Sequence, residues 1–316
     1  MKISIERGTL LKAVGQAQSV VERRNTIPIL ANVLIEAEGD TVSFRATDLD
    51  IEVVDKCAAM VERAGATTVS AVTLHEIVRK LPDGAMVQLT DDGANGRLTV
   101  EAGRSNFALA TLPKEDFPVM ASSEYHSNFT ANAAMLRRLF DKSKFAISTE
   151  ETRYYLNGIF FHVTEDGDPV LKAAATDGHR LARVTLPRPA GAEGMPDIII
   201  PRKCIAEIRK LLDESGDANI QIDLSASKIR FTFDNAVLTS KLIDGTFPDY
   251  NRVIPQGNDK LLKIDPKAFS QGVDRVATIA TEKTRAVKMA LDTDKITLSV
   301  TSPENGTAAA RSTRSA

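Results

Sequence analysis

Several features that assign sequences to common protein classes are missing from this chain of 316 residues. No uninterrupted apolar run approaches the roughly 20 residues that a membrane-spanning helix needs, so no membrane association is expected. The first residues, 1–7, alternate between polar and apolar like a strand, so we expect no signal peptide. The two cysteines, Cys57 and Cys204, form no CxxC pair, which indicates reduced core thiols in a cytoplasmic protein.

Motifs for catalysis and for metal binding are missing as well. The four histidines, His75, His126, His162 and His179, show neither HxxxH nor HExxH spacing, so no metal site is predicted. No GxxxxGK[ST] loop is available to hold nucleotide phosphates. Asp177 stands two residues before His179 at an expected strand end, but no GxSxG nucleophile motif accompanies them. We therefore predict a protein with no catalytic residues, no metal and no cofactor.

What the sequence does contain is one hairpin pattern that occurs three times. The copies span residues 26–50, 155–177 and 286–302. Thr47, Thr176 and Ser302 hold equivalent places in them, 129 and then 126 residues apart. A self-similarity at such a constant distance indicates repeated domains. The predicted domains are residues 1–125, 126–255 and 256–316.

Each predicted domain is built from strands and amphipathic helices. Apolar residues at helical spacing predict helices over residues 9–20, 73–81, 132–144, 201–212 and 266–277. Asn132 and Asp265 are the expected N-caps of two of them. Alternating strands follow each helix, so a complete domain is a doubled strand–helix–strands unit. This order predicts an α+β fold with antiparallel sheets and helices on one face.

The third domain differs from the other two. Residues 305–316 contain no apolar side chain larger than alanine. Such a segment cannot bury enough surface to fold by itself. We therefore expect an incomplete third domain, with an aberrant tail from about residue 307 and an uncovered sheet edge. Residues 1–255 are expected to fold as two proper domains, and the remainder to be frayed.

The net charge of −2 at first argues against a nucleic-acid partner. The charge is uneven, however, because the five predicted helices carry a net +9, which leaves −11 for the rest. If all five helices line one surface, that surface is basic and suits a polyanion. No aromatic residues are interleaved with these lysines and arginines, which favours phosphate contacts along a duplex over base stacking. Ordinary solvated helix faces are the alternative interpretation.

Six segments together resemble the bacterial sliding clamp family, the β subunit of DNA polymerase III. They are residues 26–32, 153–158, 176–182, 200–203, 239–245 and 247–250. The resemblance extends from Met1 to about Gly306. It implies a DNA-clamp fold with three clamp domains per subunit and a head-to-tail homodimer ring around duplex DNA. In such a ring the helices line the central hole and the antiparallel sheets lie outside. The implied function is a non-catalytic processivity factor of the polymerase holoenzyme.

The resemblance also implies a pocket between the second and third domains that binds short peptides of partner proteins. Its residues here are Leu156, Thr176, Gly178, His179, Arg180, Leu181, Pro248, Arg252 and Val253. The expected partners are the replicative DNA polymerase catalytic subunit, the clamp loader, and repair and translesion polymerases and other clamp-motif proteins. An apolar depression with a polar rim suits the capture of an anchor residue. The family completes this pocket with C-terminal residues that are not found in this sequence.

The residues expected to contact double-stranded DNA come from the resemblance and from the basic helices. They are Arg24, Arg79, Lys80, Arg137, Arg138, Lys142, Arg153, Tyr155, Arg202, Lys203 and Arg209. Glu150 departs from the family, which has a polar pair ahead of Arg153. Two functions remain open: an encircling processivity factor, or a truncated, non-encircling variant that acts as a monomeric partner-binding or regulatory protein.

Overall fold

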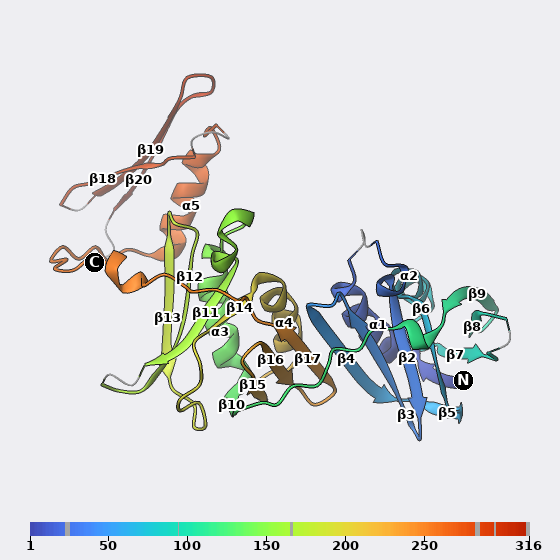
Figure 1. The fold of residues 1–316 in the computed structure, drawn as a ribbon. Coiled ribbons are helices and arrows are strands. Elements are labelled where there is room, and N and C mark those ends of the chain that lie inside the picture. Colours follow the sequence, from blue (N-terminus) through green and yellow to red (C-terminus); the bar gives the residue numbers. More distant parts are fainter. Residues whose placement is uncertain (23–25, 94, 165–166, 282–284, 294, 314–316) are drawn as a thin grey trace. The chain divides into compact units, whose positions relative to one another are not determined.

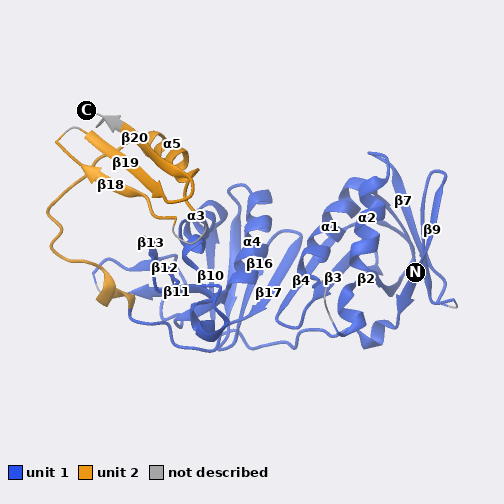
Figure 2. Ribbon diagram, turned by 90° about the horizontal axis from the view of Figure 1, so that it is seen from above, with its two compact units in different colours: residues 1–249 blue, residues 250–316 orange. Residues whose placement is uncertain are grey.

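The computed structural model describes residues 1–22, 26–93, 95–164, 167–281, 285–293 and 295–313. The chain divides into two compact units, unit 1 (Met1–Asp249) and unit 2 (Tyr250–Ala316), coloured separately in Figure 2. This division falls a few residues before the expected boundary between residues 255 and 256.

Unit 1 repeats one pattern, strand–helix–three strands, four times among its described residues (Figure 1). The first copy is β1 (Lys2–Glu6), α1 (Arg7–Val20), β2 (Asn32–Glu38), β3 (Thr41–Thr47) and β4 (Ile51–Ala58). After β5 (Met60–Arg63), the second copy is β6 (Gly65–Ser70), α2 (Ala71–Lys80), β7 (Met86–Asp91), β8 (Arg97–Ala102) and β9 (Ser105–Leu112). These two copies form the first repeat.

The second repeat has the same order of elements. Its first copy is β10 (Ser127–Asn132), α3 (Ala133–Ser143), β11 (Gly158–Thr164), β12 (Val170–Thr176) and β13 (Leu181–Pro187). Its second copy is β14 (Ile198–Pro201), α4 (Arg202–Glu214), β15 (Asn219–Leu224), β16 (Lys228–Thr232) and β17 (Ala236–Lys241). The predicted α+β arrangement of doubled units with antiparallel strands is therefore confirmed.

A 13-stranded sheet crosses from one repeat into the other, in the order β10-β15-β16-β17-β4-β3-β2-β6-β9-β8-β7-β1-β5. The crossing point is the antiparallel pair β17–β4, which runs from Ala236 opposite Asp55 to Ser240 opposite Ile51. A second sheet has the order β13-β12-β11-β14. Because β4 and β17 share backbone hydrogen bonds, the two repeats form one continuous structure.

Helices cover these sheets through apolar stripes. In α1 the buried residues include Leu10, Val14 and Val20, and the helix packs on β3 and β4. Full burial of each such side chain contributes about 1.5–3 kcal/mol. The predicted N-cap Asn132 is confirmed, because its side chain accepts hydrogen bonds from the N–H groups of Ala134 and Met135. Figure 2 shows α1, α2, α3 and α4 along the same side of unit 1.

Both cysteines carry free thiols and lie in unit 1. Cys204 is buried in α4, and burial raises the pKa of its thiol to about 12. Cys57 in β4 is half-buried, and burial raises the pKa of its thiol to about 11. Since a thiol reacts as the thiolate, both groups are unreactive near neutral pH.

Unit 2 contains the 3-10 helix η5 (Tyr250–Val253), the helix α5 (Pro266–Ala277) and the strands β18 (Lys288–Leu291), β19 (Lys295–Ser302) and β20 (Gly306–Thr313). The predicted N-cap Asp265 is confirmed by its bond from the Ala268 N–H at 2.6 Å. Gly272 lies in α5 where a Cβ would come within 3.0 Å of Leu298 Cδ1. The glycine therefore allows the close approach of α5 to β19.

The prediction of an aberrant tail from about residue 307 was wrong. β20 pairs with β19 along its full length, from Gly306 opposite Ser302 to Thr313 opposite Lys295. Ala308 and Ala310 pack against a small core that includes Val276, Ile296, Leu298 and Val300. The tail itself contributes little apolar area. The larger apolar side chains of this core come from the neighbouring strand β19 and helix α5. Backbone pairing with β19 and the packing of every second side chain against the core are sufficient for the segment to join the sheet.

Candidate functional site

Four basic side chains on the helices of unit 1 are exposed and form no ion pair with any residue that the structure describes. They are Lys80 on α2, Arg138 and Lys142 on α3, and Arg202 at the start of α4. With the observed bounds, the five helices carry a net +7 rather than +9, because α4 continues through Asp213 and Glu214. The helices are therefore basic, and these four cations are free to attract phosphates.

Other predicted DNA contacts have partners within the protein. The contacts are Arg79 with Glu76 at 2.6 Å, Arg137 with the carbonyl oxygen of Gly216 at 3.0 Å, and Arg209 with Asp141 at 2.7 Å and Asp213 at 2.9 Å. The exposed pair of Arg79 with Glu76 is weak and can exchange for a phosphate, whereas the Arg209 side chain is only 15% exposed and is held by two carboxylates. Arg24 lies outside the described residues, so its role stays a prediction.

Arg153 and Tyr155 lie in a 3-10 segment, η4 (Glu151–Leu156). The guanidinium of Arg153 binds the carboxylate of Glu150, and this hydrogen bond is the main reason that the pKa of Glu150 is lowered. Tyr155 is half-buried and its ring meets Tyr154 edge-on at 5.8 Å. Glu150 thus compensates the charge of the neighbouring arginine.

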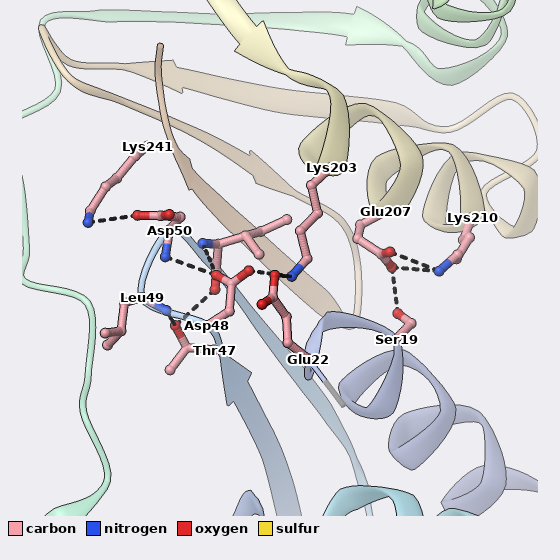
Figure 3. A network of polar contacts seen from close by, with 11 residues as sticks. Ser19, Glu22, Thr47, Asp48, Leu49, Asp50, Lys203, Glu207, Lys210 and Lys241 are labelled. Atoms are coloured by element: carbon pink, nitrogen blue, oxygen red, sulfur yellow. Dashed lines mark hydrogen bonds and ion pairs between the residues drawn. The ribbon is translucent and has the colours of Figure 1, made fainter. Parts of the chain in front are cut away.

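Lys203 has a different surrounding from the four free cations (Figure 3). Its ammonium group donates to Asp48 and, at 3.0 Å, to Glu22, both of which belong to the first repeat. Burial alone would lower the pKa of Lys203, but the bonds to Asp48 and Glu22 outweigh burial and raise it. The geometry therefore assigns Lys203 to the joint between the two repeats. Its role as a DNA contact stays a prediction.

The joint contains further polar contacts around Lys203. Lys241 on β17 pairs with Asp50 at 2.9 Å, and Ser19 on α1 donates to Glu207 on α4. Glu207 also binds Lys210 of its own helix at 2.8 Å. Figure 3 shows that these side chains extend from both repeats toward the shared boundary.

The turn between β12 and β13 contains the core of the predicted peptide pocket. Thr176 Oγ1 donates to the carbonyl oxygen of Arg180 at 2.7 Å and accepts from the Gly178 N–H at 3.0 Å. Asp177 Oδ1 accepts from the N–H groups of His179 and Arg180, both at 3.0 Å. Slight burial would raise the pKa of Asp177, but these bonds and the Arg180 guanidinium lower it to about 2. The turn is therefore held rigidly by its own side chains.

The predicted pocket residues of unit 1 differ in exposure. Leu156 is buried, Thr176 and Leu181 are half-buried, and Gly178, His179, Arg180 and Pro248 are exposed. Arg252 and Val253 belong to unit 2, where both are exposed. Their role as a peptide pocket stays a prediction.

One aromatic residue next to this turn escaped the sequence analysis. The ring of Phe145 is 55% exposed, and the guanidinium carbon of Arg180 lies 5.7 Å from its centroid. An exposed aromatic ring with a cation on its face can hold an apolar peptide anchor. The sequence contains one signal for this residue. Phe145 directly follows the predicted helix over residues 132–144 and does not belong to the apolar stripe of that helix.

Comparison with known proteins decides the family. Models of the N-terminal, central and C-terminal domains of the DNA polymerase III β subunit match residues 1–121, 130–249 and 251–313, in that order. The chain belongs to the sliding clamp family. The resemblance found in the six sequence segments is thereby confirmed, and the C-terminal match extends to residue 313, within the segment expected to be aberrant.

Relatives of this clamp chain are similar over nearly its whole length. The β sliding clamp of Caulobacter vibrioides is 55% identical over 98% of this chain and 83% of the relative, and that of Rickettsia bellii is 40% identical over 98% and 80%. A Bartonella birtlesii clamp bound to griselimycin superposes with a TM-score of 0.95 at 48% identity, covering 99% of this chain and 84% of that one. A Caulobacter crescentus clamp gives 0.94 at 54% identity, covering 99% and 83%.

No helix among the described residues is long and apolar enough to cross a membrane. No group of three or more His, Cys, Asp or Glu side chains among them is arranged to hold a metal ion.

Proposed function

We propose that this chain acts as a processivity factor in DNA replication, encircling duplex DNA and tethering the polymerase to it. The ring is a homodimer in which the helices face the DNA. Processivity then comes from the closed topology rather than from tight binding. The named relatives, all β sliding clamps, support this proposal. They do not favour the alternative of a truncated, non-encircling variant.

The observation that carries the proposal is the set of four free cations on α2, α3 and α4. The helices share one side of unit 1, and each free cation can meet a phosphate without breaking an internal ion pair. Contacts to phosphates alone carry no sequence information, which suits a protein that must slide.

Salt-dependent duplex binding tests this helix face. Replacement of Lys142 by alanine should reduce the slope of log affinity against log salt by about 1, as expected for the loss of one phosphate contact. Lys56→Ala is the matched control, because Lys56 is an exposed cation on β4 whose side chain alternates to the face opposite Asp55. An equal change of slope in both variants would contradict a DNA-binding helix face.

We also propose that the turn Thr176–Arg180, with Leu156, Leu181, Pro248, Arg252 and Val253, binds short partner peptides with apolar anchors. The partners are the replicative polymerase, the clamp loader, and repair and translesion polymerases. The rigid turn and the exposed Phe145 beside it support this proposal.

A peptide titration by fluorescence anisotropy tests the pocket. Val253→Asp places a charge among apolar contacts and should weaken binding by about tenfold or more. Met60→Asp is the matched control, because Met60 and Val253 are each 68% exposed and neither change affects the core. Unchanged affinity in Val253→Asp would remove this residue from the pocket.

Light scattering across a concentration series tests the ring itself. A stable particle of twice the chain mass supports the encircling clamp. A monomer at every concentration would instead support a non-encircling protein. In either case we propose a non-catalytic role in the cytoplasm, alongside the polymerase that performs the chemistry.

A further inference from the structure

A cavity of about 160 Å³ lies between the two repeats, where α1, β4, α4 and the turn between β16 and β17 meet. The polar residues that line it include Lys12, Gln16, Asp55, Glu214 and Asp234. None of these residues belongs to the candidate DNA contacts or to the peptide pocket. The cavity therefore needs an explanation of its own.

Asp55 is the central feature of this cavity. Asp55 is only 5% exposed, yet its carboxylate makes no hydrogen bond or ion pair with any residue that the structure describes. A buried carboxylate without a partner is costly. Burial raises the pKa of Asp55 to about 6, the negative charge of Glu214 adds to this rise, and Lys12 opposes it.

Two cavity side chains that carry N–H donors, Lys12 and Gln16, are engaged with Glu214. Lys12 is already paired with Glu214 at 2.7 Å, and Gln16 Nε2 donates to the same carboxylate at 3.4 Å. Gln16 Oε1 is buried and accepts no hydrogen bond within the described protein. These two donor groups of the cavity wall are therefore paired with Glu214 rather than with Asp55.

The charges that face the cavity are also unbalanced. α1 contributes Lys12, β4 contributes Asp55, α4 contributes Glu214, and the β16–β17 turn contributes Asp234. With all four groups ionised, the wall carries a net charge of −2. The complementary ligand is a cation with N–H donors. A cavity of about 150 Å³ can hold a molecule the size of benzene, so a ligand of a few heavy atoms fits.

We propose that this cavity binds a small organic cation with N–H donors, either an alkylammonium or a guanidinium ion, between α1, β4 and α4. The cation hydrogen-bonds to Asp55 and to Gln16 Oε1, and its charge offsets the excess of carboxylates. Because the wall comes from both repeats, the bound cation stabilises their joint. The proposal is independent of DNA and peptide binding.

Titration of the full chain with two probes, methylguanidinium and n-propylammonium, followed by amide NMR shifts, tests the proposal. At least one probe should give saturable shifts confined to residues around the cavity, such as Ala218 and Asn235. Tetramethylammonium has the charge but no N–H donor, and urea has the donors but no charge. Neither control should produce those shifts. Equal response to tetramethylammonium, or no response to either probe, would overturn the proposal.

Three variants locate the site. Asp55→Asn removes the charge with little change of shape and should weaken binding by about tenfold or more. Gln16→Leu should weaken it by a smaller factor, because only a neutral acceptor is lost. Asp50→Asn is the matched control, since Asp50 lies at the same joint but pairs with Lys241 outside the cavity, and it should leave binding unchanged. Binding that survives both Asp55→Asn and Gln16→Leu would also overturn the proposal.

Discussion

Two turns in unit 1 have the same internal structure and different surroundings. In the first repeat, Thr47 Oγ1 donates to the carbonyl oxygen of Ile51 at 2.9 Å and accepts from the Leu49 N–H at 3.0 Å. Asp48 Oδ1 accepts from the N–H groups of Asp50 at 2.9 Å and Ile51 at 2.8 Å. The same four bonds hold the turn from Thr176 to Arg180 in the second repeat. Even the left-handed third residue is shared, with φ of 80° at Leu49 and 89° at Gly178.

The difference between the turns lies in the second carboxylate oxygen. Asp48 Oδ2 binds Lys203 from the other repeat, and the Asp48 side chain is only 7% exposed. Asp177 Oδ2 binds Arg180 of its own turn at 2.9 Å, and that side chain is 23% exposed. One repeated turn thus serves as an internal joint in one place and as a surface feature in the other. The cation that reaches the carboxylate decides which role the turn has.

The largest expected effect comes from removing the two cations. Lys203→Met leaves the buried Asp48 without its ammonium partner and should reduce the free energy of unfolding by about 3 kcal/mol. Arg180→Met removes an exposed partner and should cost less than about 1 kcal/mol. Urea unfolding of both variants measures the difference. Equal losses would show that the two turns are not distinguished by their cations.

The pH dependence of stability should differ in sign between two carboxylates. Asp55 at the joint has a pKa raised to about 6, so the folded chain binds its proton more tightly than the unfolded chain does. Its contribution to stability is therefore full below about pH 4 and is lost as pH rises through 6. Asp177 has a pKa lowered to about 2, so its contribution is present above about pH 4 and is lost as pH falls through 2.

Asparagine variants separate these two contributions. Asp55→Asn should stabilise the chain at pH 7 by about 2 kcal/mol and remove the decline between pH 4 and 6. Asp177→Asn should destabilise it at pH 7 and remove the decline at the acid end. Thermal unfolding between pH 3 and 8 gives both profiles. If the Asp55→Asn variant lost stability with rising pH as steeply as the parent chain, the loss between pH 4 and 6 could not be assigned to Asp55.

The glycine of the surface turn gives a smaller effect. Gly178→Ala forces a side chain into the left-handed region, and its Cβ would come within 2.6 Å of Arg153 Nη1. The expected cost is about 1 kcal/mol, because the end of Arg153 can move aside while the backbone strain remains. The same change should weaken binding of a clamp-motif peptide. Gly167→Ala, with φ of 81° and open space around it, is the control for strain without contact.

The reverse substitution in the joint gives the smallest effect. Leu49 is 42% exposed and already has φ of 80°, so Leu49→Gly relieves strain and loses little burial. We expect a stabilisation of about 0.5 kcal/mol, because the greater freedom of glycine in the unfolded chain offsets part of the relief. Urea unfolding measures it. A loss of stability would mean that the Leu49 side chain contributes contacts that its exposure does not indicate.

Features that depend on neighbouring residues could be predicted from the sequence, whereas contacts between residues far apart in the chain could not. The repeated hairpins and the N-caps at Asn132 and Asp265 depend on residues a few positions apart, and the structure confirms them. The sequence predicts Lys203 only as a helix-face cation, because its partners Asp48 and Glu22 are 155 and 181 residues away. The strand at residues 306–313 was missed for a related reason, since its burial depends on β19 and α5. The individual DNA and peptide contacts remain predictions.

The most direct test of the central claim is retention on DNA of different topology. The chain is loaded by a bacterial clamp loader onto a nicked circular plasmid, washed at high salt, and the plasmid is then cut once to make it linear. We predict retention on the circle through the salt wash and rapid loss from the linear DNA, because a ring slides off free ends. Equal dissociation from circular and linear DNA would contradict an encircling clamp.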